Sequence, residues 1–430
     1  MTMPLARFSD TLTVLGYSFT REGPCLIYPM IVDKDLEQMI SAIEEREVDS
    51  GAIANQMLSV PETNTQDDET RLETLLYRNS RCERHEILEF KESFIRHLSQ
   101  NCSGKKEIGA GGQARVIKGE FRNKEIAIKI IDQKSNMGAS LALREINVTN
   151  YLRHPNIVSL LGTSITSFGL CLLYPFVKGK DLKKILYEHD ELLTAKQRFK
   201  IIREIAEAIH HIHEIPFRES GKVLVHSDIQ PANIMIENFD ENNPGDTELI
   251  AKLIDFGILN EIEVTKNESG QNVTTHITKT MHLIGVKRYV PPEGLAPQQG
   301  GNKEINRARD VFAFGMVLMD VLTNEGFDTS KSAAADSAAE LVSRINLESK
   351  DLTQILKSNF KNHHVEWSGE EKESAVELIN IAKKCIDQDK NHRPHMKEIV
   401  EEFERESLKT AFLKAQSKTG GTRRVNFDQD

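Results

Sequence analysis

The sequence predicts an α+β protein in which a strand-rich region precedes a helical one. Residues 105–132 (KKEIGAGGQARVIKGEFRNKEIAIKIID) contain two or three β-type runs separated by turn residues, and LCLLYPFV at 170–177 ends a further strand pair. After that point apolar residues recur every three or four positions, as in Phe199, Ile202 and Ala206. Runs of strands followed by runs of helices are typical of the α+β class.

Composition sets the outer limits. The 430 residues include 55 Lys and Arg against 65 Asp and Glu, a net charge of −10, with 39% hydrophobic and 28% charged residues. These values fit an ordinary globular protein, exclude a collagen or a coiled-coil rod, and disfavour a nucleic-acid binder. The five cysteines are scattered without a CxxC pair, which indicates a reducing compartment. No apolar run reaches the ~18 residues of a membrane helix, so we expect a cytoplasmic protein without a transmembrane segment.

The first hundred residues carry apolar spacing but no recognisable chemistry. Two helices are predicted from residues at helical spacing: Leu36, Met39, Ile40 and Ile43 in one, and Ile87, Phe90, Phe94 and Leu98 in the other. The polar stretch 60–68 between them is typical of a linker. We interpret 1–100 as a mainly helical extension that packs, regulates or binds a protein partner, and 406–430 as a flexible tail.

A glycine loop and a strand lysine are the first candidates for chemistry. Gly109, Gly111 and Gly112 lie between strand-like flanks, where backbone without Cβ atoms can approach a phosphate closely. Taken alone, this loop fits a glycine-rich hairpin equally well. Lys129 ends the apolar run Ile-Ala-Ile, and Glu145, on a predicted helix over 141–152, is a candidate partner for its charge. A lysine that reaches solvent is the simpler alternative.

Two short carboxylate motifs follow in loop and strand-end contexts. His226, Asp228 and Asn233 form H-x-D-x-x-x-x-N after a short strand, and Asp255-Phe256-Gly257 follows the predicted strand 252–254. Such an aspartate can accept a proton from a hydroxyl nucleophile, and the asparagine and second aspartate suit a divalent metal. Each fragment alone is also compatible with a turn or a helix cap.

Taken together and in this order, the motifs resemble those of protein kinases. Further segments agree with that family: HPNIV at 154–158, YVPPE at 289–293, DVFAFG at 310–315 and Arg393-Pro394. The resemblance covers about 105–405 and implies a bilobal kinase domain over 101–405, with a β-rich N-lobe at 101–175 and a helical C-lobe at 176–405. Residues 170–182 resemble the tyrosine-kinase-like group, which includes the interleukin-receptor-associated kinases.

The resemblance implies roles for individual residues. ATP with Mg²⁺ or Mn²⁺ binds between the lobes, with Lys129, held by Glu145, on the α- and β-phosphates. Asn233 and Asp255 hold the metal, Asp228 deprotonates the substrate hydroxyl, and Tyr174 is the gatekeeper behind the adenine. The other expected ATP-binding residues are Ile108, Gly109, Gly111, Gly112, Val116, Ala127 and Val177. The implied reaction is phosphorylation of Ser/Thr hydroxyls in protein substrates, as in cellular signalling.

Three departures from the family pattern keep alternatives open. Ser227 stands for the usual arginine of the catalytic loop, Gln230 for a lysine and Val286 for a threonine. Ser227 favours weak dependence on loop phosphorylation, while Gln230 favours a slower chemical step. A pseudokinase scaffold that binds nucleotide, a tyrosine or dual-specificity kinase and a small-molecule phosphotransferase are the alternatives.

The segment 255–293 is long and threonine-rich, and autophosphorylation is expected there. Its candidate acceptors are Thr265, Thr274, Thr275, Thr278 and Thr280. A polar loop without phosphorylation is the simpler interpretation of the same residues. In an intracellular bacterium, such a chain would be expected to act as a translocated effector in the host cytoplasm.

Overall fold

The structure is a computed structural model, and it describes the parts of the chain that carry most of these motifs. The described residues are 16–20, 23–27, 65–83, 87–100, 107–110, 114–131, 142, 145–146, 148–149, 151–215, 222–242, 248–257, 259–266, 272–275, 286–295, 305–323 and 369–405. They form two compact units. The first unit comprises 1–81, 85–143 and 160–175, and the second comprises 82–84, 144–159 and 176–430. The helix expected over 36–43 and the tail 406–430 lie outside the described residues.

A six-stranded sheet is the centre of the first unit, in the order β3-β7-β8-β6-β5-β4. Its strands are β3 (Leu88–Glu89), β4 (Glu107–Ala110), β5 (Ala114–Phe121), β6 (Lys124–Ile131), β7 (Gly162–Thr166) and β8 (Gly169–Pro175). All pairs are antiparallel except β3 with β7. A two-residue turn at Arg122 and Asn123, both with positive φ, joins β5 to β6 and matches the twist of a tight hairpin. The strands expected in 105–177 are therefore confirmed.

The register assigns the two faces of this sheet. Val116 lies opposite Lys129, and Ala127 lies opposite Tyr174, so these four residues share one face. Ile128 and Leu173 lie at intervening positions, so they share the other face, and both are fully buried. Val116, Ala127, Lys129 and Tyr174 therefore lie on the face opposite to the buried core of this sheet.

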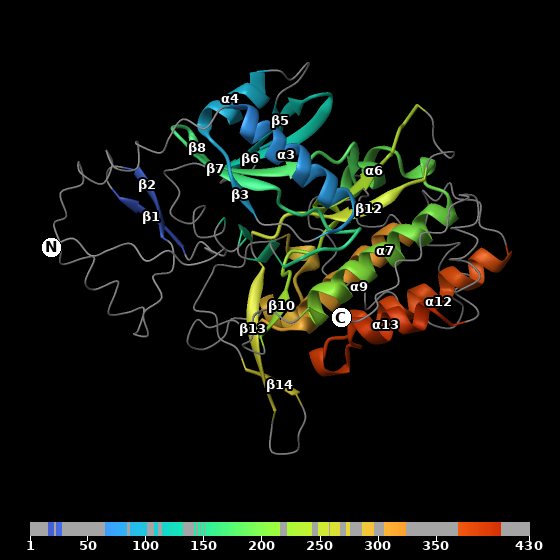
Figure 1. Cartoon of the computed structure of the whole chain (residues 1–430). Coiled ribbons are helices and arrows are strands. Elements are labelled where there is room, and N and C mark those ends of the chain that lie inside the picture. Colours follow the sequence, from blue (N-terminus) through green and yellow to red (C-terminus); the bar gives the residue numbers. More distant parts are fainter. Residues whose placement is uncertain are drawn as a thin grey trace. The chain divides into compact units, whose positions relative to one another are not determined.

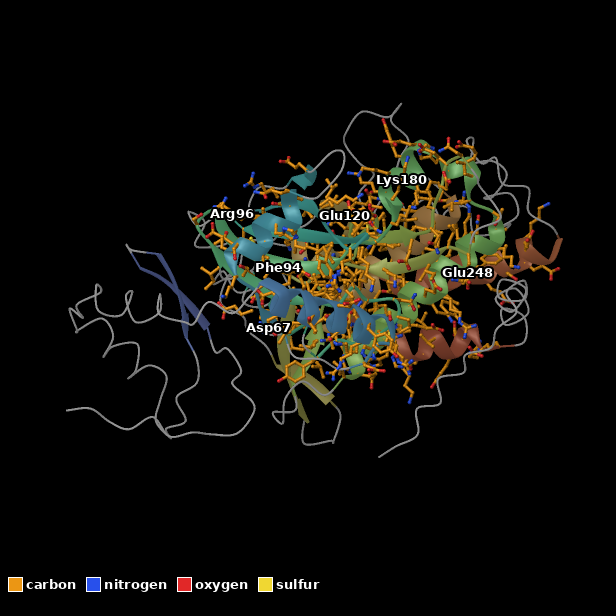
Figure 2. All side chains as sticks on the ribbon, turned by 45° about the horizontal axis from the view of Figure 1, so that its top comes forward. Asp67, Phe94, Arg96, Glu120, Lys180 and Glu248 are labelled. Atoms are coloured by element: carbon orange, nitrogen blue, oxygen red, sulfur yellow. The ribbon has the colours of Figure 1, made fainter. Side chains whose placement is uncertain are left out.

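Two helices before the family motifs cover the apolar face. α3 (Thr65–Ser80) and α4 (Glu92–Gln100) lie over β5 and β6 in Figure 1. One apolar cluster unites both helices with the sheet, and its buried members include Leu72, Leu75, Phe94, Ile95, Leu98, Phe121, Ile126, Ile128 and Leu173. Figure 2 labels Phe94, which is the largest of these side chains contributed by α4.

Three predictions for the N-terminal region are wrong in detail. The stretch 60–68 is not all linker, because α3 begins at Thr65. The second helix begins only at Glu92, and residues 88–89 before it form the strand β3. β3 approaches β7 closely at Gly162, where an added Cβ would lie 2.4 Å from the Phe90 ring and 2.5 Å from the Leu88 carbonyl oxygen. The strands β1 (Gly16–Thr20) and β2 (Gly23–Ile27), an antiparallel pair, were also not expected in a mainly helical region.

The second unit is built around helices. Its longer members are α7 (Ala195–Glu214), α9 (Arg307–Thr323), α12 (Gly369–Cys385) and α13 (Met396–Phe403), and the shorter α6 (Leu182–Glu188) precedes them. α9 packs against α7 and α12, while α13 packs against α7. The predicted α7 face is confirmed, since Phe199, Ile202, Ala206, Ile209 and His213 are all buried. A capping box between Thr194 and Gln197 fixes the start of this helix.

Two small sheets carry the loops of interest in the second unit. β9 (Gly179–Asp181), β11 (Ile234–Glu237) and β12 (Ile250–Leu253) form one, in the order β12-β11-β9. β10 (Lys222–Val225), β13 (Asn260–Lys266) and β14 (Asn272–Thr275) form the other. Strands predicted at 223–225, 234–236 and 252–254 are therefore confirmed, with the last ending one residue early. The loop between β10 and β11 and the loop after β12 hold the carboxylate motifs.

Candidate active site

Asp228 lies in the loop after β10, and two amides hold its carboxylate. The Asn233 side chain donates from Nδ2 to Oδ2 at 2.7 Å and to the Asp228 carbonyl oxygen at 2.9 Å. The Gln230 side chain donates from Nε2 to Oδ1 at 2.9 Å. The five-residue spacing works because a short 3₁₀ turn over Pro231–Asn233 folds the chain back toward Asp228. The sequence motif thus becomes a fixed carboxylate with both oxygens oriented.

The electrostatics of Asp228 suit a group that takes up a proton. Burial raises the pKa of this carboxyl above its ordinary value, and the negative charge of Asp255 raises it further. His226 and the amide hydrogen bonds from Asn233 and Gln230 oppose the rise without cancelling it. A carboxylate whose pKa is raised toward neutrality is a better general base than an ordinary aspartate.

Asp255 lies at the end of β12, close to this loop because β11 and β12 are paired. Ile234 is opposite Leu253, and the Ile254 amide donates to the Asn233 carbonyl oxygen at 2.9 Å. Asp255 has a φ of 63°, is exposed, and accepts a hydrogen bond from the Gly257 amide at 3.4 Å. The next residue, Phe256, is buried, and its ring centroid lies 5.0 Å from that of His226.

Asn233 and Asp255 fit a magnesium ion by their chemistry. The Asn233 amide nitrogen is committed to Asp228, which leaves the amide oxygen as the atom that can face a cation. Carboxylate and amide oxygens are the ligands Mg²⁺ prefers, together with phosphate oxygens. Burial is the main cause of the raised pKa of Asp228, and the charge of Asp255 adds to it, which a cation at this position would offset.

Asp310, in the first turn of α9, binds the backbone of the loop between β10 and β11, the candidate catalytic loop. Its Oδ2 accepts from the His226 amide at 2.7 Å and from His213 Nε2 at 3.0 Å, and its Oδ1 accepts from the Ser227 amide at 2.8 Å. The carboxylate is fully buried. Burial alone would raise its pKa, but the His213 hydrogen bond and charge and the loop amides outweigh burial and lower it. Asp310 thus fixes the backbone of this loop, and His213, on the buried face of α7, takes part in the same contact.

Glu293 and Arg393 join the end of the threonine-rich segment to the loop before α13. Arg393 makes two parallel hydrogen bonds to the carboxylate, at 2.7 and 2.9 Å, and a further one to the Asp387 carbonyl oxygen at 2.9 Å. The guanidinium lies 4.9 Å above the Phe312 ring of α9. Such bidentate pairs fix geometry as well as charge, so the segment end at α8 (Pro292–Leu295) is firmly anchored.

The structure describes some of the remaining predicted site residues but not others. Lys129 lies within β6 in the first unit, whereas Glu145 is a buried helical residue of the second, so their pairing stays a prediction. Ile108 and Gly109 lie on β4, and Val177 is a buried residue of the second unit. Thr149, one turn after Glu145, is fully buried and its hydroxyl donates to the Glu145 carbonyl oxygen. Gly111, Gly112, Thr278 and Thr280 lie outside the described residues.

The described part of the threonine-rich segment forms a hairpin. β13 pairs with β10 on one side and with β14 on the other, which places Thr265 opposite Val273 and Thr274 opposite Val264. Thr275 lies opposite Glu263 at the end of the same pairing. Val286, in the same segment, is 49% exposed. This hairpin was not predicted, because β14 (NVTT) is only four residues long and shows no alternation of apolar and polar residues.

Comparisons with known proteins agree with this arrangement of motifs. The protein kinase domain family matches residues 102–403, and the chain therefore belongs to the protein kinase family. The chain is 29% identical to U-box domain-containing protein 70 of Oryza sativa subsp. japonica over 313 residues, which are 72% of this chain and 33% of that relative.

Other relatives extend the comparison. The chain is 26% identical to the serine/threonine-protein kinase pelle of Drosophila melanogaster over 337 residues, 74% of this chain and 60% of pelle. It is 35% identical to the putative L-type lectin-domain containing receptor kinase V.8 of Arabidopsis thaliana over 222 residues, 51% of this chain and 31% of that protein. The chain thus spans between 31% and 60% of the length of these relatives. Among the described helices, none is both long and apolar enough to cross a membrane.

Proposed function

We propose that this chain is an active protein kinase that transfers the γ-phosphate of ATP to Ser or Thr hydroxyls of protein substrates, itself included. The observation that carries the proposal is the carboxylate of Asp228, whose two oxygens are fixed by Asn233 and Gln230 beside Asp255. A hydroxyl proton needs an acceptor that is oriented and held at a raised pKa, and Asp228 has both properties.

The other proposed site residues position the nucleotide and the metal ion. Lys129, paired with Glu145, binds the α- and β-phosphates, and the face of the sheet with Val116, Ala127 and Tyr174 binds the base with Ile108 and Val177. Asn233 and Asp255 hold Mg²⁺ or Mn²⁺, which neutralises charge on the phosphates. Catalysis by such a site is mainly orientation and charge stabilisation.

The domain limits belong to the same proposal. The kinase domain extends over 101–405, and the extension 1–100 binds a protein partner. The Ser/Thr preference is supported by the relative named serine/threonine-protein kinase pelle and by Pro231 in the catalytic loop.

A nucleotide-binding pseudokinase is the second candidate, and one observation favours it. Gln230, which hydrogen-bonds Asp228, is a neutral amide and cannot neutralise charge that develops on the transferred phosphate.

An assay of phosphate transfer separates the two. The purified chain is incubated with γ-labelled ATP, Mg²⁺ or Mn²⁺ and myelin basic protein, and the labelled amino acids are identified. Label on serine or threonine supports the first candidate, and label on tyrosine corrects its specificity. ATP binding that depends on Lys129, without any transfer, supports the second.

A further inference from the structure

In the first turn of α9, four consecutive residues make hydrogen bonds to three other parts of the second unit. Arg307 donates to the His213 carbonyl oxygen at the end of α7, and the Ala308 carbonyl oxygen accepts from Arg393 at 3.2 Å. Arg309 and Asp310 both bind the catalytic loop. The family motif accounts for Asp310 and Arg393, but not for Arg309, which the sequence analysis did not single out.

Arg309 and Asp310 together hold both polar groups of one strained residue. Ser227 has a φ of 70°, in the left-handed region that a serine rarely adopts. Its amide donates to Asp310 Oδ1 at 2.8 Å, and its carbonyl oxygen accepts from Arg309 Nε and Nη2, both at 3.2 Å. Because Asp228 is the next residue, the orientation of the Ser227 carbonyl group sets the direction in which the chain enters Asp228.

The charge of Arg309 also acts on the site. Burial lowers the pKa of this guanidinium, while attraction to Asp310, Asp228 and Glu293 raises it, and an arginine stays charged in such surroundings. Space for it comes from Gly294, where an added Cβ would lie 3.3 Å from Nη1. The Arg309 guanidinium on α9 therefore lies near the carboxylates of Asp228, Asp310 and Glu293. It places a positive charge next to Ser227, which has none.

We propose that Arg309 is a positioning residue for Asp228: it fixes the left-handed Ser227 peptide and supplies from α9 a cation that the catalytic loop itself lacks. The proposal rests on the proposed function for its kinetic consequences, but not for its structural ones. It gives the site a cation that needs no phosphorylated threonine.

The test compares three variants with the wild type. Arg309→Gln removes the charge and the forked donors, Arg309→Lys keeps the charge alone, and Arg307→Gln removes a neighbouring arginine that binds His213 rather than Ser227. For each variant kcat, KM for ATP and hydrogen exchange of residues 224–230 are measured. Thermal unfolding identifies any variant that fails to fold.

For Arg309→Gln we expect kcat to fall about 10- to 100-fold, as it does when a reacting group is misplaced, with KM for ATP changed less than about twofold. Arg309→Lys keeps the charge and should restore part of kcat, whereas Arg307→Gln should leave kcat and KM for ATP unchanged.

Hydrogen exchange distinguishes a failure of the proposed function from a failure of the inference on Arg309. If the wild type transfers no phosphate, the proposed function fails, while faster exchange of 224–230 in Arg309→Gln but not in Arg307→Gln still supports the positioning role. Equal exchange in the folded variants overturns the inference. So does an active Arg309→Gln variant with an unchanged kcat.

Discussion

Gln230 donates a hydrogen bond of 2.9 Å to Oδ1 of Asp228, so a neutral amide is the partner of the candidate catalytic carboxylate where the family usually has a lysine. Together with Asn233 on Oδ2, it provides the carboxylate oxygens with neutral amide donors. These hydrogen bonds orient the carboxylate, but Gln230 adds no charge where a lysine would. Variants of Gln230 test whether the orientation of Asp228 or the missing positive charge has the larger effect on phosphate transfer.

Replacing Gln230 with lysine should accelerate transfer. A charged donor exceeds a neutral one by about 1 kcal/mol, which corresponds to about a fivefold rise in kcat. Gln230→Ala, which loses the hydrogen bond without adding charge, should lower kcat by a similar factor. Steady-state kinetics at saturating ATP checks both. A slower Gln230→Lys enzyme with unchanged thermal unfolding would show that the amide is specifically required.

The segment before the family match should be essential for stability. Phe94 of α4 is fully buried against the sheet, and Phe94→Ala should lower the free energy of unfolding by about 3–5 kcal/mol. Tyr77 of α3 is 59% exposed, so the matched Tyr77→Ala variant should change it by less than about 0.5 kcal/mol. Urea unfolding measures both. Equal, small effects would mean that α4 does not cover the sheet in solution.

A histidine pair should make stability depend on pH. His154 packs on His211 with ring centroids 5.1 Å apart, and its Nδ1 accepts from the Asn156 amide at 3.2 Å. Burial first, and then the positive charges of His211 and Lys252, lower the pKa of His154 from 6.5 to about 3. Between pH 6.5 and about pH 3, His154 binds a proton in the unfolded chain but stays neutral in the folded chain. Stability from this residue is therefore complete above pH 6.5 and is lost as the pH falls toward 3.

Unfolding measured from pH 7 to pH 5 checks this sign. His154→Gln should make the free energy of unfolding less dependent on pH by up to about 1.4 kcal/mol per unit. His392, with a side chain that is 68% exposed, provides the control, and His392→Gln should leave the dependence unchanged. An identical slope in wild type and His154→Gln would contradict a neutral, half-buried His154.

Local patterns predicted much of the fold. The face of α7 follows from helical spacing, and the strands β5 and β6 follow from β-type runs around a turn. The strand β3 was missed because its pairing with β7 joins residues more than seventy positions apart, and a two-residue strand has no periodicity of its own. Its only local trace is Gly162, which the close approach requires.

The candidate site, too, could be predicted only in part from the sequence. Asp228, Asn233 and Asp310 were found because their motif spacing carries a mechanism. Arg309 was not, because nothing in the sequence separates an arginine that binds a loop carbonyl from one that reaches solvent. The pairing of Lys129 with Glu145 depends on the placement of two units, which no local pattern determines.

The most direct test of the central claim is phosphate transfer by the wild type and by Asp228→Asn, which keeps the size of the side chain and removes its charge. The assay uses γ-labelled ATP with Mg²⁺ or Mn²⁺, alongside ATP binding and thermal unfolding of both proteins. We predict transfer to serine or threonine by the wild type and a loss of about a thousandfold or more in the variant, with ATP binding retained. Equal transfer by the two proteins, or none by a folded wild type that binds ATP, would contradict the account.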